Sequence, residues 1–209
     1  MPALTRSAAR RLAEAAPDAA NERALALRES VTQKADAVWA HRGGVDLYTG
    51  ASKSSTDVAQ VDHCLEVQLG ELALVRAFGD DRAAGTQSMA TAQATELLRD
   101  ALNGLDNLNV TSKKVNQAKR GPITAAINRL RDERLRSVPI RQLVKQGRGS
   151  WMLEDGGPWP AIERAVVASY DAADAALADG RADALPAAAA LVEGSMVELG
   201  RVLQTLHIR

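Results

Sequence analysis

An acidic side chain and an imidazole stand next to each other at Asp62 and His63. Hydrolysis of a phosphodiester needs a water made nucleophilic, a cation near the charge that develops on the phosphate, and basic groups that hold the strand. On a bent strand end, a carboxylate can hold a metal while the neighbouring imidazole faces the water. The pair therefore indicates metal-assisted hydrolysis, and a hard carboxylate oxygen suits magnesium.

Two asparagines further along the chain flank a predicted step from strand to helix, Asn107 before it and Asn116 after it. An amide oxygen at the start of a short helix can supply a second, neutral ligand and leave coordination positions for water and phosphate. Lys119 and Arg120 follow directly.

Three stretches, LYTG, QVDHCLEVQ and NLNVTSKKVNQAKRGP, together resemble the HNH (His-Me finger, ββα-metal) endonuclease family. The resemblance covers roughly residues 45 to 122. It implies a small ββα core and a one-metal endonuclease (phosphodiester hydrolase) that uses Mg²⁺, for which Mn²⁺ substitutes. Nucleic acid is the implied substrate, with DNA favoured over RNA.

The resemblance also implies a role for individual residues. His63 is the expected general base that activates water, and Asp62 and Asn116 are the expected metal ligands. Asn107 is expected to tie the loop between the two strands, and Lys119 to approach a phosphate.

Composition favours helices packed through small side chains, because hydrophobic residues make up 46% of the chain, much of it alanine, while aromatic residues make up 3%. We expect an α+β, mainly helical fold with a small ββα-metal HNH core and helical additions at both ends. The expected segments are an N-terminal helical segment (1–40), an HNH-like core with a basic helical extension (41–148) and a C-terminal helical pair (149–209).

Hydrophobic periodicity and turn residues place the elements within these segments. Helices are predicted over 5–39, 68–78, 88–102, 161–177 and 186–206, and strands over 45–49, within 58–69 and over 108–111. Ser112 is a predicted N-cap of a helix that ends near Gly121-Pro122. Residues 123–146 form one basic amphipathic helix, or two that are separated near Pro139.

Charge is unevenly distributed in a chain whose formal net charge is zero. Between residues 113 and 148 only Asp132 and Glu133 oppose a run of basic residues, which makes a polyanionic partner plausible. The alternative is a solvated helix face that binds nothing. The candidate nucleic-acid contacts are Lys113, Lys114, Lys119, Arg120 and Arg129.

A single cysteine, Cys64, excludes an intramolecular disulfide and the Cys-x-x-Cys pairs of zinc ribs, so no structural zinc is expected. Its neighbour His63 is poorly placed for proton transfer, so Cys64 is interpreted as a small buried residue. No apolar run reaches the roughly 20 residues of a membrane span, and the N-terminus lacks the apolar middle of a secretory signal. We therefore expect a soluble, cytoplasmic protein without membrane contact.

Several interpretations stay open at this level. The three tryptophans could stack on bases, but we favour the interpretation that they anchor the core or an interface. They are Trp39, Trp151 and Trp159. Glu66 and Gln68 either orient the site or face solvent. The alternative functions are a catalytically silent HNH-fold nucleic-acid-binding or interaction module and a nuclease toxin effector. A homodimer or a protein partner would use the terminal helices.

Overall fold

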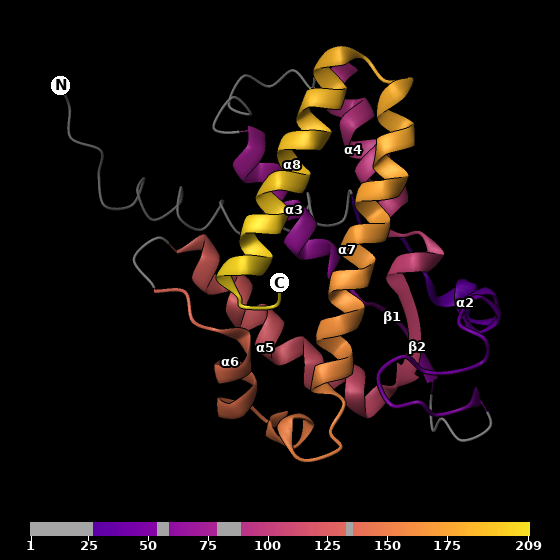
Figure 1. Ribbon diagram of the computed structural model, residues 1–209, viewed down its shortest axis with the longest axis vertical. Helices are drawn as coiled ribbons and strands as arrows, with labels where there is room; N and C mark the ends of the chain where they lie inside the picture. Colours follow the sequence, from indigo (N-terminus) through magenta and orange to yellow (C-terminus); the bar gives the residue numbers. More distant parts are fainter. Residues whose placement is uncertain (1–26, 54–58, 79–88, 133–135) are drawn as a thin grey trace, which may run out of the picture.

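The computed structural model describes residues 27–53, 59–78, 89–132 and 136–209, and this part of the chain is mainly helical with one small antiparallel sheet (Figure 1). The predicted mainly helical α+β class is therefore confirmed. The predicted helices before residue 27 and the GDDRAAG loop at 79–85 lie outside the described residues. Of the predicted N-terminal helices, a short 3-10 turn at Thr32–Lys34 and helix α2 (Ala35–His41) are described.

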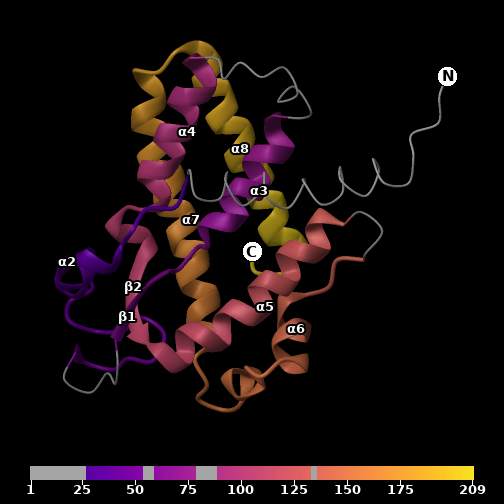
Figure 2. The same cartoon turned by 180° about the vertical axis from the view of Figure 1, so that it is seen from behind.

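Four helices pack together along the long axis of the molecule (Figures 1 and 2). They are α3 (Val67–Phe78), α4 (Met89–Leu102), α7 (Trp159–Ala182) and α8 (Pro186–Thr205). Helix α8 contacts the other three, and the short turn after α7 makes α7 and α8 an antiparallel pair, as the sequence predicts.

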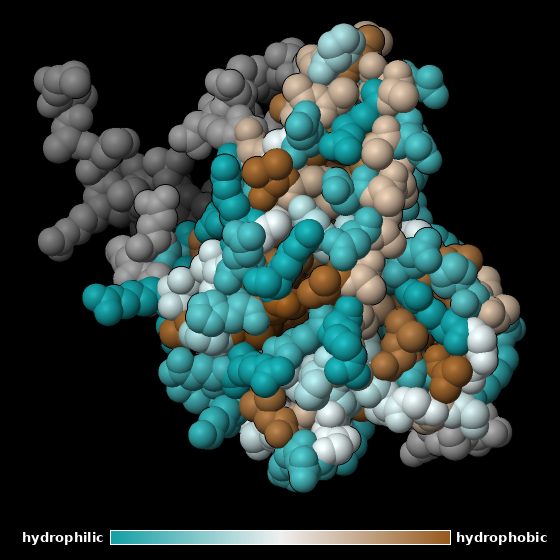
Figure 3. All heavy atoms as spheres, in the orientation of Figure 1, coloured by the Kyte–Doolittle hydropathy of each residue, from teal (hydrophilic) through white to brown (hydrophobic). Residues whose placement is uncertain are grey.

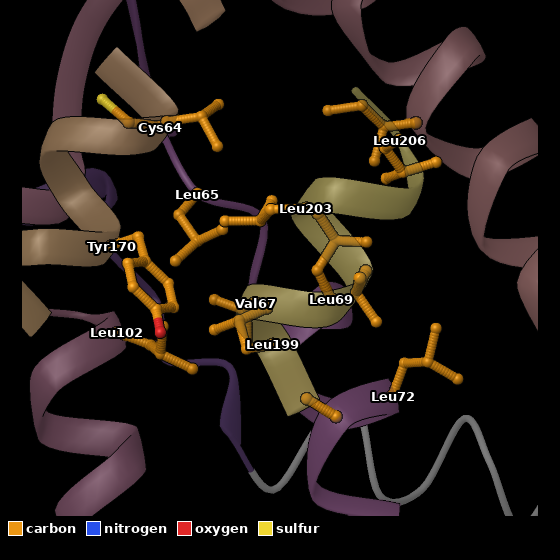
Figure 4. Close-up of a cluster of buried hydrophobic side chains, with 14 of the residues drawn as sticks. Cys64, Leu65, Val67, Leu69, Leu72, Leu102, Tyr170, Leu199, Leu203 and Leu206 are labelled. Carbon is orange, nitrogen blue, oxygen red and sulfur yellow. The ribbon is translucent and has the colours of Figure 1, made fainter. Parts of the chain in front are cut away.

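The main hydrophobic cluster draws residues from all three predicted segments, including Leu27, Leu65 and Leu203. Figure 4 shows Leu65 and Val67 beside Leu199 and Leu203 of α8. The stretch that follows His63 is therefore anchored by the C-terminal helix, although almost 140 residues separate Leu65 from Leu203 in the chain. Burial of this apolar surface is the main stabilising contribution to the arrangement.

The sheet has two strands, β1 (Ala59–His63) and β2 (Leu108–Ser112), and helix α5 (Lys113–Arg131) follows β2 directly. The register pairs Asp62 with Asn109 and His63 with Leu108. As predicted, Ser112 caps the helix, because its Oγ accepts a hydrogen bond from the backbone N–H of Val115. The two strands pair in space and α5 follows β2, but in the chain α3 and α4 lie between β1 and β2.

One face of the sheet packs on α2 through a second hydrophobic cluster. Val38 and Trp39 of α2 lie against Leu108 and Val110 of β2. Side chains alternate between the two faces of a strand, so the neighbouring Asn109 and Thr111 face away from α2. Both are buried, and both bond to the loop that covers the other face.

The predicted strand over 45–49 is wrong. The segment is a turn with a single antiparallel bridge between Val45 and Ser52. The Asp46 carboxylate accepts hydrogen bonds from the backbone N–H of Tyr48 and the hydroxyl of Thr49, and such local bonds compete with a strand ladder. Gly50 then takes a φ of 72°, which closes the turn at little steric cost.

Helix α5 also differs from its prediction, because it continues through Pro122 to Arg131. A proline inside a helix removes one backbone hydrogen bond and costs about 3 kcal/mol. Ile123, Ala126, Ile127 and Leu130 are all buried, and this tertiary packing outweighs the local cost. The second basic helix, α6 (Ile140–Gln146), begins after Pro139, which is the two-helix alternative of the sequence analysis.

Hydrophilic side chains cover most of the described surface on the face that Figure 3 shows, and hydrophobic residues lie among them in small groups. In the described part of the chain, no helix combines the length and apolar character that crossing a bilayer requires.

Replacing Leu203 by alanine should destabilise the protein by about 2–5 kcal/mol, because its side chain is fully buried and the cavity left behind would not close. The free energy of unfolding in urea measures the effect. Val197→Ala is the matched control on the same helix, since Val197 is 48% exposed and its loss should cost less than about 0.5 kcal/mol. Equal effects of both substitutions would contradict the described packing of α8.

Candidate functional site

A buried ammonium lies at the junction of β1 and α5. Lys119 is completely buried, and its Nζ donates to Asp62 Oδ2 at 2.6 Å and to the backbone carbonyl of His63. The Glu66 carboxylate lies 3.2 Å from the same nitrogen. Tyr48 donates its hydroxyl proton to Asp62 Oδ2 at 2.8 Å. Helix α5, strand β1 and the 45–52 loop therefore meet around one positive charge.

The electrostatics of this cluster keep Lys119 and Asp62 ionised at neutral pH. Burial would lower the pKa of Lys119, but the Asp62 and Glu66 carboxylates more than offset burial and raise it above its usual range. Burial raises the pKa of the Asp62 carboxyl to about 6 although the Lys119 ammonium opposes the rise. Burial also raises the pKa of Tyr48, so its hydroxyl stays protonated and donates.

The LYTG turn owes its shape to Asp46, which is 1% exposed. Besides the two bonds inside the turn, its carboxylate accepts hydrogen bonds from Asn109 Nδ2 at 2.7 Å and Thr111 Oγ1 at 2.8 Å. Asn109 Oδ1 in turn accepts the backbone N–H of Leu47. These bonds fasten the turn to β2 and hold the Tyr48 hydroxyl at Asp62.

His63 lies in a separate hydrogen-bond network from its neighbour Asp62. Its Nε2 lies 3.0 Å from Asn103 Oδ1, at the end of α4. The Asn103 amide has only one orientation that satisfies its partners, because Nδ2 donates to the carbonyls of Leu27 and Arg99. Since Oδ1 is then an acceptor, His63 Nε2 must carry the proton that it donates.

Burial lowers the pKa of His63, although the hydrogen bond to Asn103 opposes the change, so the imidazole is neutral at pH 7. A neutral ring with its proton on Nε2 has its lone pair on Nδ1. Nδ1 is therefore the nitrogen of His63 that can accept a proton.

Asn107 lies directly before β2 in the chain and contacts the segment that links β1 to α3. Its Oδ1 accepts the backbone N–H of Leu65 at 2.7 Å, and its Nδ2 donates to the carbonyls of Leu65 and Leu102. The backbone N–H of Cys64 also bonds to the Asn107 carbonyl. Three of these four bonds join the two ends of the segment inserted between the strands, which contains α3 and α4, and the bond to Leu102 holds Asn107 to the end of α4.

A polar cavity of about 210 Å³ opens over the end of β1 and the first turns of α5. Asp62, His63 and Glu66 line it from the β1 side. Other polar lining residues are Arg28, Gln60, Gln68, Asn116, Gln117, Arg120 and Thr124. Asn116 donates from Nδ2 to Gln60 Oε1 at 3.1 Å, so the amides of β1 and α5 are joined across the cavity.

Asp62 does not fit the predicted role of metal ligand in this arrangement. Its Oδ2 already accepts two hydrogen bonds, and the adjacent ammonium of Lys119 repels a second cation. Within the described ranges, no three His, Cys, Asp or Glu side chains lie close enough together to hold a metal ion. Asn116 lines the same cavity but is bonded to Gln60. The predicted magnesium ion therefore enters no step derived below.

The predicted nucleic-acid contacts separate into distinct groups. Lys119 has no exposed surface for a phosphate, so its predicted contact is wrong. Arg120 lines the cavity beside His63, while Lys113 and Lys114 line a neighbouring groove. Arg129 lies further along α5 and donates to the carbonyl of Arg136.

Sequence reasoning missed three residues of this site. They are Asn103, Tyr48 and Arg28. Only Tyr48 carries a usable sequence signal, because it lies in LYTG, one of the three stretches that resemble the HNH family. Glu66 faces the buried ammonium of Lys119. Cys64 is a buried thiol, as predicted.

No protein-family model matches the chain, and no curated protein or solved structure matches it.

Substituting Lys119 by methionine should destabilise the protein by about 3–5 kcal/mol, because the buried Asp62 carboxylate and the partly buried Glu66 carboxylate would lose their only paired ammonium within this cluster. Urea unfolding of the variant measures the loss. Lys113→Met removes the same charge from an exposed position of α5 and should have little effect. Adding Asp62→Asn to Lys119→Met should recover part of the stability, and a fully additive double variant would contradict the pairing.

Stability should fall as the pH drops below about 6.5, because the unfolded chain then binds a proton at His63 that the folded protein resists. Thermal melting between pH 7.5 and 5 tests this. Asp62, whose pKa is raised, contributes in the opposite direction, so the informative quantity is the difference between wild type and His63→Gln. Glutamine keeps a donor for Asn103 but does not titrate. Parallel pH curves for both proteins would contradict the lowered pKa.

Proposed function

We propose that the protein hydrolyses phosphodiester bonds of nucleic acid, with His63 as the general base that activates the attacking water. The observation that carries this proposal is the bond from His63 Nε2 to Asn103 Oδ1. It leaves the lone pair of a neutral imidazole on Nδ1, and His63 lines a polar cavity that Arg28 and Arg120 also line.

The charge of the cavity supports an anionic ligand. Arg28, Arg120 and the buried Lys119 supply three positive charges, against the two negative charges of Asp62 and Glu66. A phosphate would bind to the exposed guanidinium of Arg120, which donates hydrogen bonds to the non-bridging oxygens. The water proton passes to His63 Nδ1 as the water oxygen forms its bond to phosphorus, and the bond from phosphorus to one sugar oxygen breaks. That oxygen leaves with the electron pair and takes a proton from solvent, while the guanidinium groups stabilise the charge that develops.

The antiparallel pair of strands with α5 directly after β2 supports the same proposal, because His63 ends β1 and Asn116 and Arg120 follow on α5, as the resemblance to HNH endonucleases implies; α3 and α4 are inserted between the strands. We take DNA as the first substrate to test. The one-metal mechanism and its magnesium ion belong to the proposal only as far as the chelator experiment below supports them.

One observation favours a second candidate, a catalytically silent nucleic-acid-binding module. His63 is only 3% exposed, so a water and a phosphate must reach Nδ1 through the cavity. A protein that binds nucleic acid on its basic surface without cutting it would have the same fold and charges.

Purified protein should nick supercoiled plasmid, and His63→Ala should lower the rate at least about 100-fold, the usual scale for loss of a general base. His63→Gln keeps the donor to Asn103 and should be equally inactive, which separates lost chemistry from lost folding. His41→Ala is the matched control, since His41 is an exposed histidine paired with Asp106.

The plasmid assay is run in magnesium, in manganese and in chelator. Cleavage that needs His63 in any of these conditions supports the proposed hydrolysis, and the chelator arm decides whether a divalent ion takes part. Absence of cleavage in all three, with DNA binding intact, would contradict the proposal and favour the silent module.

A further inference from the structure

A second recess lies beside the His63 cavity, at the start of α5. It has a volume of about 680 Å³, and Lys113, Lys114, Gln117, Arg148 and Trp151 line it together with two small residues. The lysines and Gln117 come from the first turns of α5, Arg148 follows α6, and Trp151 belongs to a short 3-10 turn at Ser150–Leu153. We call this recess the Trp151 groove.

The charge of the Trp151 groove is uniformly positive. Lys113, Lys114 and Arg148 are all exposed, and no acidic side chain lines the groove. The ring of Trp151 carries one of these charges on its face, because Lys114 Nζ lies 4.5 Å from the ring centroid. The groove therefore combines cationic groups for phosphates with an aromatic surface.

Trp151 differs from the other two tryptophans in its exposure. Trp39 and Trp159 are buried in hydrophobic clusters, at 5% and 1% exposure, whereas Trp151 is half-buried. A half-buried indole beside lysines and an arginine is the combination with which proteins bind unpaired bases, because every base presents a π-face. In a duplex those faces are covered by neighbouring base pairs, so the groove suits a single strand.

The groove is continuous with the candidate active site. Gln117 lines both the Trp151 groove and the His63 cavity. Along α5, seven residues separate Lys113 from Arg120, which is about 10 Å at 1.5 Å per residue. A strand that binds in the groove would reach Arg120 within about three nucleotides.

We propose that the Trp151 groove binds single-stranded nucleic acid next to the phosphate that is cut, with one base stacked on Trp151 and the flanking phosphates on Lys113 and Arg148. Lys114 leaves the ring face as the base stacks, and its ammonium then contacts a phosphate. This inference rests on the proposed function for the position of the scissile phosphate, and it adds the substrate class, an unpaired strand.

Tryptophan fluorescence tests the proposal directly, because two of the three indoles are shielded in the core. Full-length His63→Gln protein in chelator is titrated with single-stranded DNA and RNA oligonucleotides of about 12 nucleotides, which span one site. The same sequence as a duplex, and inorganic polyphosphate as a probe with charge but no bases, are titrated in parallel. Single strands should quench the emission, while duplex and polyphosphate should not.

Three added variants and one control variant identify the contacts. Trp151→Leu should weaken single-strand binding about tenfold or more and remove the quenching. Trp151→Phe should keep most of the affinity, because its ring still stacks. Lys113→Ala with Arg148→Ala should lower the slope of log affinity against log salt by about 2. Arg201→Ala on α8, outside the lining of the groove, should change none of these values.

Two results would overturn the proposal: unchanged single-strand affinity in Trp151→Leu, or equal binding of polyphosphate, duplex and single strand with no quenching. Cleavage is measured separately with the wild-type protein, which keeps His63, and with the Trp151→Leu variant of that protein. If Trp151→Leu changes neither single-strand binding nor cleavage while plasmid cleavage is intact, only the groove proposal is contradicted. Stacking on Trp151 without cleavage of any substrate contradicts the proposed hydrolysis alone.

Discussion

The buried ammonium of Lys119 is the constraint on which the candidate site depends. It lies in the second turn of α5 and is completely buried, with Asp62, Glu66 and the His63 carbonyl around it. An unpaired charge at such depth would be strongly destabilising, so α5 must lie where its ammonium meets both carboxylates. That requirement fixes α5 against β1 and brings Arg120 and Asn116 to the cavity beside His63.

The same cluster separates the roles of two neighbouring residues. Asp62 is neutralised by Lys119 and held by Tyr48, while His63 points into the network of Asn103. Alternation along β1 produces this division, because successive side chains face opposite sides of a strand. The carboxylate therefore serves the internal charge balance of the protein, while the imidazole donates from Nε2 to Asn103 and keeps its lone pair on Nδ1.

The positive groups form two sets with different surroundings. Arg28 and Arg120 lie at the small cavity that contains His63, whereas Lys113, Lys114 and Arg148 surround an aromatic ring in a wider groove. Gln117 lies between them and lines both. This arrangement supports one extended ligand with phosphates at several positions, since a single small anion would need only one of the two sets.

The sequence alone determined the mainly helical class, strand β2, the Ser112 cap of α5, and helices α3, α4, α7 and α8. It could do so because periodicity and capping act over a few residues. It also singled out His63 and Asn107 through their motif. Only the tertiary structure decided that Lys119 is buried, that α5 passes through Pro122 and that Asn103 orients His63. Those outcomes depend on contacts between residues 40 to 57 positions apart, such as His63 with Asn103 and Asp62 with Lys119. Local propensity contains no information on such contacts, because burial and charge pairing are settled only when distant elements pack.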